Sequence, residues 1–246
     1  LYTGAAGSAV EYPNPGQVTQ ALNISALTPR LFLTIIGGGG GSCNAGVYNP
    51  PYGKLAGAAG GGSYVQWFSG LNGTGALMQT TSAEGGAGVA AGSVGSNRSS
   101  ASGVAGQASS KAAGGTAGNY SGGAGGHGSF GSGGGGPAGT DTYNGSSNAP
   151  VNVSASAGVT FSQNVEVPIQ PGTGNRAQSI KIFVGYGGAG GQGFSEFIGG
   201  NDNVQGANVA AGGNGGNGFV SVADPNSGGI EVDLLNILSR LTALEG

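Results

Sequence analysis

Charged side chains are scarce in this sequence, at 7% of the residues against about 25% in ordinary soluble domains. The few that occur are not mainly basic: seven Lys and Arg stand against ten Asp and Glu, for a net charge of −3. Nucleic-acid binding requires a basic surface. The sequence therefore predicts no nucleic-acid partner.

Cysteine and histidine each occur once, as Cys43 and His127. A single cysteine forms no intrachain disulfide, and a single histidine makes no zinc-type cluster. Catalysis needs several titratable groups close together, whereas the aspartates here are isolated along the chain. We therefore expect no enzyme activity, no metal site and no cofactor.

Long apolar runs are also missing. None approaches the 18 or so residues of a membrane span, so insertion into a membrane is not expected. No secretory leader is recognisable, and the chain begins at Leu1 rather than at a methionine. We expect a processed chain or a part of a longer one.

Glycine, by contrast, accounts for 59 of the 246 residues. Between Ser121 and Pro137 it recurs at every third position, from Gly122 to Gly134. Three residues per turn is the period of a polyproline II-type helix, which makes no internal hydrogen bonds. Buried copies must therefore bond to neighbouring chains. We interpret this stretch as one rod of a bundle; the alternative is a flexible low-complexity chain.

Other segments repeat the same triplet. In 185–193 the spacing leaves Tyr186, Ala189 and Gln192 on one side, and in 212–218 it leaves Asn214 and Asn217. Shorter glycine-rich runs occupy 37–41, 60–62 and 85–95. These repeats predict several ordered rods that pack side by side.

Segments with the character of β-strands lie between the glycine runs. In 62–68, Tyr64 and Gln66 fall on one face and Val65 and Trp67 on the other, and 76–81 is expected to pair with this strand. The other segments with strand character are 30–36, 151–167, 178–184 and 218–223. This order predicts a mainly β fold, an antiparallel β-sandwich with inserted polyglycine II helices as its long connections.

The order of parts resembles the glycine-rich, polyglycine II domain family of phage tail-fibre and other virion attachment proteins. The resemblance covers about residues 21–223 and rests on four segments: Leu31 to Gly41, Gly60 to Val65, Ile182 to Gly191 and Gly215 to Val222. The chain is similar also to the glycine-rich region of certain receptor tyrosine kinase ectodomains, where polyglycine helices grow out of a jelly-roll-like sandwich. Residues 92–119 depart from the compact pattern and are interpreted as an insertion that could be mobile.

The composition changes after 225–229. A 4-3-4-3 spacing, the apolar seam of a coiled coil, is formed by Ile230, Leu234, Ile237, Leu241 and Leu244. Arg240 and Glu245 occupy the g and e positions, and 240–245 resembles the motif of trimeric coiled coils. So short a helix is marginal alone, so 227–246 is predicted to form a trimeric coiled-coil segment after a glycine-rich domain over 1–226. The alternative is a helix that packs on its own domain.

These features predict a non-enzymatic virion structural protein, a homotrimeric tail-fibre or spike adhesin on the virion surface. Its partners would be other virion proteins and a glycan or outer-membrane protein of the host surface, because aromatic faces and amides suit such recognition. The aromatic residues expected to contact the receptor are Tyr48, Tyr52, Tyr120, Phe130, Tyr143 and Tyr186. Trp67 is instead expected in the core. The alternatives are a purely structural subunit (capsid decoration, fibre shaft or secreted filament) without receptor binding, and ice binding by a flat polyglycine face.

Overall fold

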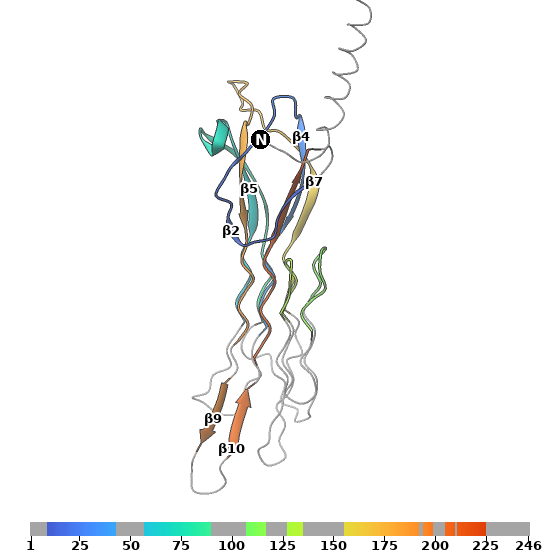
Figure 1. Ribbon diagram of the computed structural model, residues 1–246, viewed down its shortest axis with the longest axis vertical. Helices are drawn as coiled ribbons and strands as arrows, with labels where there is room; N and C mark the ends of the chain where they lie inside the picture. The colour runs from blue at the N-terminus through green and yellow to red at the C-terminus, as the bar shows by residue number, and fades with distance from the viewer. Residues whose placement is uncertain are drawn as a thin grey trace, which may run out of the picture.

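In the part of the chain that the structure describes, the fold is mainly β, with two antiparallel sheets and almost no helix (Figure 1). The structure is a computed structural model. It describes residues 9–42, 57–89, 107–116, 127–134, 155–191, 194–198, 205–209 and 211–224. The only helical element among them is a single 3-10 turn, η1 (Leu71–Gly73).

The first sheet has the order β1-β11-β4-β7 and the second the order β2-β8-β5-β6, with β3 also paired to β8. The strands of the first sheet are β1 (Val10–Tyr12), β11 (Phe219–Ala223), β4 (Arg30–Ile36) and β7 (Thr160–Glu166). Those of the second are β2 (Gly16–Gln17), β3 (Leu22–Asn23), β8 (Ser179–Val184), β5 (Ser63–Phe68) and β6 (Leu77–Ala83). A separate hairpin pairs β9 (Phe194–Ile198) with β10 (Gln205–Val209).

Alternation of apolar and polar side chains decides which face of each strand is buried, because successive residues point to opposite faces. In β5, Val65 and Trp67 are fully buried while Tyr64, Gln66 and Phe68 are half-buried. The indole N–H of Trp67 donates to Thr81 Oγ1 on β6 at 3.3 Å. The predictions that Trp67 lies in the core and that β5 pairs with the following strand are confirmed.

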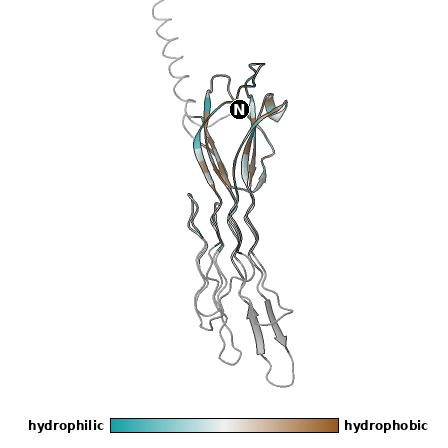
Figure 2. Ribbon diagram, turned by 180° about the vertical axis from the view of Figure 1, so that it is seen from behind, coloured by the Kyte–Doolittle hydropathy of each residue, from teal (hydrophilic) through white to brown (hydrophobic). Residues whose placement is uncertain are grey.

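The two sheets share one hydrophobic core. Both sheets contribute its buried side chains, which include Leu33, Ile35, Val65, Trp67, Ile180, Ile182, Val184, Val220 and Val222. Figure 2 shows the apolar residues gathered in this part of the molecule, while the segments that extend from it are nearly neutral in hydropathy.

Six strands are directly continued by extended segments of mainly small residues, most of them glycine-rich, which we call rods. The rods are 37–42 after β4, 57–62 before β5, 84–89 after β6, 155–159 before β7, 185–191 after β8 and 211–218 before β11. They run away from one end of the two sheets, and the β9–β10 hairpin lies beyond them (Figure 1).

Two expectations from the sequence are wrong. The strand character expected from 151 onward does not apply to 155–159, which is a rod; its small side chains let it enter the bundle, and the strand begins only at Thr160. The stretch 121–137 is not one straight rod either. Its described part, 127–134, turns back at Phe130 and Gly131, where φ is +44° and +80°, and Ser132 N–H donates to Ser129 O at 3.0 Å.

Candidate functional site

The rod 37–42 lies at the centre of a bundle. Its six successive N–H groups donate in rotation to three neighbouring rods, and the partner repeats at every third residue. At N···O distances of 2.8–3.0 Å, Gly37 and Gly40 donate to rod 155–159, Gly38 and Gly41 to rod 57–62, and Gly39 and Ser42 to rod 211–218.

The carbonyl groups of the same rod accept from three further segments. Gly38 and Gly41 accept from rod 84–89, Gly39 and Ser42 from rod 185–191, and Gly40 from Gly134 of the 127–134 hairpin. The central rod therefore has six neighbours, and all six of its residues are buried. Its backbone donors and acceptors are paired almost completely, although it has no partner within its own segment, as burial requires.

The six neighbours form a closed ring, because each is hydrogen-bonded to the next. The bonds around the ring are Gly60 N–H to Gly86 O, Ser156 N–H to Ala87 O, Gly158 N–H to Gly131 O, Gly216 N–H to Ser132 O, Gly215 N–H to Gly188 O and Gly61 N–H to Tyr186 O. Chain direction alternates around the ring, since the rods continue antiparallel strands.

Glycine is required here because the backbones are too close for side chains. A Cβ atom at any of Gly37 to Gly41 would lie 1.9–2.1 Å from a carbonyl oxygen of a neighbouring segment. Packed sheets are normally about 10 Å apart because side chains fill the gap. In the bundle that gap is gone: Gly38, which continues the first sheet, donates to Gly61 of the second at 2.8 Å.

Three of the ring rods, 84–89, 185–191 and 211–218, expose every third residue. In 185–191 the exposed positions are Tyr186 and Ala189, and in 211–218 they are Asn214 and Asn217, as the triplet spacing predicts. The two asparagines also bond to the adjacent rod: Asn217 Oδ1 accepts from Gly187 N–H at 3.0 Å and Asn214 Oδ1 from Gly190 N–H at 2.7 Å. Their amide groups therefore satisfy backbone donors that no further rod reaches.

His127 also takes part in the bundle. Its Nδ1 accepts a hydrogen bond of 3.0 Å from the backbone N–H of Asn214. Within the part of the chain that the structure describes, no group of three or more His, Cys, Asp or Glu residues is placed to hold a metal ion. The position of His127 is thus explained by a structural hydrogen bond.

Phe130, at the turn of its hairpin, packs against Phe219 of the first sheet. Its ring meets Phe219 edge to face, with centroids 6.0 Å apart, and the Lys111 ammonium lies 3.8 Å from the Phe219 centroid. Lys111 also pairs with Glu11 at 3.0 Å. Lys111 belongs to a second hairpin, 107–116, within the stretch interpreted as an insertion; there Gln107 N–H donates to Ala155 O at 3.0 Å.

The structure separates the aromatic residues expected to contact a receptor. Tyr186 is 57% exposed at the start of its rod, and Phe130 is 37% exposed on the Phe219 cluster. The remaining four, Tyr48, Tyr52, Tyr120 and Tyr143, lie outside the described residues. So do all the residues expected to form the oligomer: Ile230, Leu234, Ile237, Arg240, Leu241, Leu244 and Glu245.

Rod ends define where the undescribed segments connect. Ser42, Gly57, Val89, Gly191 and Gly213 lie at one level of the bundle. Ser42 is hydrogen-bonded to Gly213 and Gly191, Gly57 is bonded to Val89, and Val89 N–H donates to Gly41 O, next to Ser42. This level is the end remote from the sheets. The chain therefore leaves and re-enters the bundle there for the connections 43–56 and 192–210.

A second aromatic surface lies on the outer face of the second sheet. Tyr64 stacks on Phe183 with centroids 4.9 Å apart, and Lys181 Nζ lies 4.9 Å from the Phe68 centroid. This surface was not among the contacts predicted from the sequence. Side-chain alternation in β5 places Tyr64 on the face away from Trp67, and this could be seen in the sequence. Its pairing with Phe183 depends on the register between β5 and β8, which only the structure gives.

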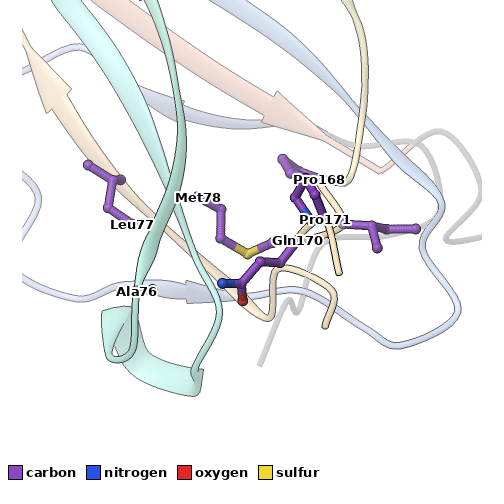
Figure 3. Close-up of a pocket in the computed structure, with 7 residues that line it drawn as sticks. Ala76, Leu77, Met78, Pro168, Gln170 and Pro171 are labelled. Atoms are coloured by element: carbon purple, nitrogen blue, oxygen red, sulfur yellow. The ribbon is translucent and has the colours of Figure 1, made fainter. Parts of the chain in front are cut away.

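The other end of the sheets, away from the rods, carries an apolar hollow of about 150 Å³. Figure 3 shows Met78 reaching from β6 toward the loop that holds Pro168, Gln170 and Pro171. Leu77 and Ile169 complete the lining and are 52% and 64% exposed.

Comparison of the chain with protein-family models, with curated proteins and with solved structures finds no match. Among the described residues, no helix has the length and apolar character that crossing a membrane requires.

Proposed function

We propose that this chain is a non-enzymatic virion attachment protein, a homotrimeric fibre or spike adhesin, in which the rods are polyglycine II helices that grow out of a jelly-roll-like sandwich. The repeat of hydrogen-bond partners at every third residue of the central rod supports the helix type, because three residues per turn is its period. The attachment-protein family that the sequence resembles has the same order of strand and glycine run.

One structural relationship carries the functional proposal: the first and last residues that the structure describes lie at the end of the sheets away from the rods, and the rod connections start at the far end of the rods. Val10 pairs with Val222 at the end of the first sheet that faces away from the rods, and Asp224 follows there. The connections 43–56 and 192–210 start and finish at the far end of the bundle. A chain anchored to a particle by its termini would thus present its rod connections outward.

The bundle supplies the rigidity that such a presentation needs. Each ring rod bonds to the central rod and to both ring neighbours, so bending one rod would break bonds in several directions. A preorganised recognition surface loses little conformational entropy on binding. Tyr48 and Tyr52 belong to the connection 43–56, and Tyr143 lies in 135–154, so three of the expected receptor contacts occur in sequence where the rods end.

The test is binding of the fluorescently labelled full-length chain to a panel of bacterial cells, measured by flow cytometry. Replacing Tyr48 and Tyr52 together by Ser should reduce binding about 10-fold or more, because aromatic anchors dominate interface energy. Tyr64→Ser is the matched control, since Tyr64 lies on the outer face of the sandwich, and it should leave binding unchanged. The proposal would be contradicted if the variant with Tyr48 and Tyr52 replaced bound cells as well as the parent chain, or if Tyr64→Ser lost more binding than that variant.

A purely structural subunit is the second candidate, and one observation favours it. The backbone N–H groups of Tyr186 and Ala189 have no hydrogen-bond partner among the described residues. A row of open peptide groups on a rod face could accept a rod of another molecule, as an open sheet edge accepts a strand. Concentration-dependent filament formation in light scattering, without binding to any cell of the panel, would favour this function over adhesion.

A further inference from the structure

The end of the sandwich away from the rods exposes several large apolar side chains. Leu27, Leu77 and Ile169 are between half and two-thirds exposed, and the hollow beside Met78 lies among them. A space of about 150 Å³ lined by apolar side chains is large enough to hold a benzene-sized apolar group. We call the surface formed by Leu27, Leu77, Met78, Pro168, Ile169 and Pro171 the apolar end.

Two loops build this surface and are tied together. Arg176 Nη1 donates to the carbonyl oxygens of Ser25 and Ala26, which precede Leu27. Arg176 also forms an isolated bridge with Ile169. The apolar end is therefore one continuous, braced surface.

The described chain ends at the edge of this surface. Thr28 Oγ1 donates to the carboxylate of Asp224, and Thr28 adjoins Leu27. On the other side, Val167 N–H donates to Pro29 O at 2.9 Å, and Val167 adjoins Pro168 of the hollow. The residues after Asp224 thus begin next to the apolar end. The connection 225–229 is five residues long and can span at most about 17 Å.

The C-terminal segment carries apolar residues beyond its coiled-coil seam. With Leu234 at position a, Val232 falls at f, Leu235 at b and Leu238 at e. These three residues form a second apolar stripe, which we call the outer stripe. It stops at Leu238, since Thr242, Ala243 and Glu245 follow on that side. A helix that is apolar on two sides must be covered on both sides. In this segment only the N-terminal half, which follows the connection 225–229, is apolar on two sides.

Charge also favours this contact. Arg176 Nη2 is buried and has no hydrogen-bond partner among the described residues, and a guanidinium group carries a positive charge. The C-terminal segment brings Glu231 and Asp233, on either side of Val232. A contact that brings this segment against Arg176 would place opposite charges close together.

We propose that the outer stripe of the C-terminal segment packs on the apolar end of the sandwich of the same chain, with one of its side chains in the hollow beside Met78. The short connection selects the segment of the same chain over that of a second copy. Such a contact sets the orientation of the C-terminal helix on the domain. It leaves the seam free, so it holds whether or not the seam forms a trimer.

Cysteine cross-linking of the full-length chain tests the proposal. Cys43 is the only cysteine, so a Cys43→Ser background removes competing thiols. In that background, Ile169→Cys combined with Leu235→Cys should form a disulfide within one chain under mild oxidation, identified on a non-reducing gel and by peptide mass spectrometry. The matched control combines Ile169→Cys with Asn236→Cys. It moves the second thiol from position 235 to position 236, about 100° further around the helix axis, and should form at least 10-fold less disulfide.

Each other outcome overturns the proposal. A disulfide between two chains would assign the apolar end to a second copy, and equal cross-linking in the control, or none in either pair, would mean that the outer stripe does not dock there.

An independent check uses Ile169→Ser and Leu235→Ser. Each substitution should lower the urea midpoint of unfolding. The midpoint of the double variant should be no lower than that of the less stable single variant, whereas additive shifts in the midpoint would contradict a contact. Leu241→Ser, in the seam, should leave the cross-link intact whatever it does to the oligomeric state.

Discussion

The hydroxyl group of Ser63 donates a hydrogen bond of 2.6 Å to the carbonyl oxygen of Ile36, although the two residues belong to different sheets. The same oxygen of Ser63 accepts from Gly185 N–H at 2.9 Å, and Ser63 is fully buried. This junction is where three strands become rods. On the side of the strands, side chains separate the two sheets. On the side of the rods, backbone groups of neighbouring segments are hydrogen-bonded directly to one another.

Ser63→Ala should destabilise the fold. It would leave the Ile36 carbonyl and the Gly185 N–H buried without this partner, and each such group costs about 1–3 kcal/mol. Urea unfolding followed by the fluorescence of the single tryptophan measures the change. Ser82→Ala, an exposed serine on the neighbouring strand, should stay within about 0.5 kcal/mol of the parent. Equal effects in the two variants would show that the junction hydroxyl is dispensable.

Gly40→Ala should be among the most damaging single substitutions. The added Cβ would lie 2.0 Å from the Ala87 carbonyl oxygen, which belongs to backbone and cannot rotate away, so a loss of about 3 kcal/mol or more is expected. Gly61→Ala is the control in the same bundle, because its Cβ would come no closer than 3.3 Å to Tyr186 N. We expect a change of about 1 kcal/mol or less there, measured by thermal denaturation.

Lys111→Met should cost more stability than Glu11→Gln. The ammonium lies 3.8 Å from the Phe219 ring centroid, and a cation over an aromatic face contributes about 0.5–2 kcal/mol. The ion pair with Glu11 is partly exposed on both sides, so its loss is expected to cost less than about 1 kcal/mol. Chemical denaturation of both variants gives the comparison; a larger effect from Glu11→Gln would mean that the ion pair, not the ring, holds the 107–116 hairpin.

Asn217→Ala should speed hydrogen exchange at one backbone amide. The Asn217 side-chain oxygen accepts from Gly187 N–H, and losing that acceptor exposes the amide to solvent. Asn217→Asp keeps an acceptor oxygen and should restore protection. Gly190, which is bonded to Asn214, serves as the internal reference in the same NMR experiment. If exchange at Gly187 does not change, the side-chain bond is absent in solution.

The strand pattern and the triplet spacing were readable in the sequence for a local reason: side-chain alternation and three-residue periodicity act within one segment. They predicted the strands β4, β5, β8 and β11, the burial of Trp67 and the exposure of Tyr186 and Asn217. They failed at 155–159, because alternating Ala and Ser suit a strand face and a rod equally well. They failed also at Phe130, where contact with Phe219 and Lys111 accompanies a turn that glycine spacing does not encode.

The sequence by itself determined that rods exist and which one can be central. Gly37 to Gly41 is the longest unbroken glycine run in the sequence, so this segment can be surrounded on all sides, whereas a rod with a larger side chain at every third position must turn that side chain outward. Tertiary structure decided which rods are neighbours. Glycine backbones present the same peptide groups on every side and so lack pairwise specificity. The order of the strands above them, set by the side chains of the shared core, places each rod in the ring.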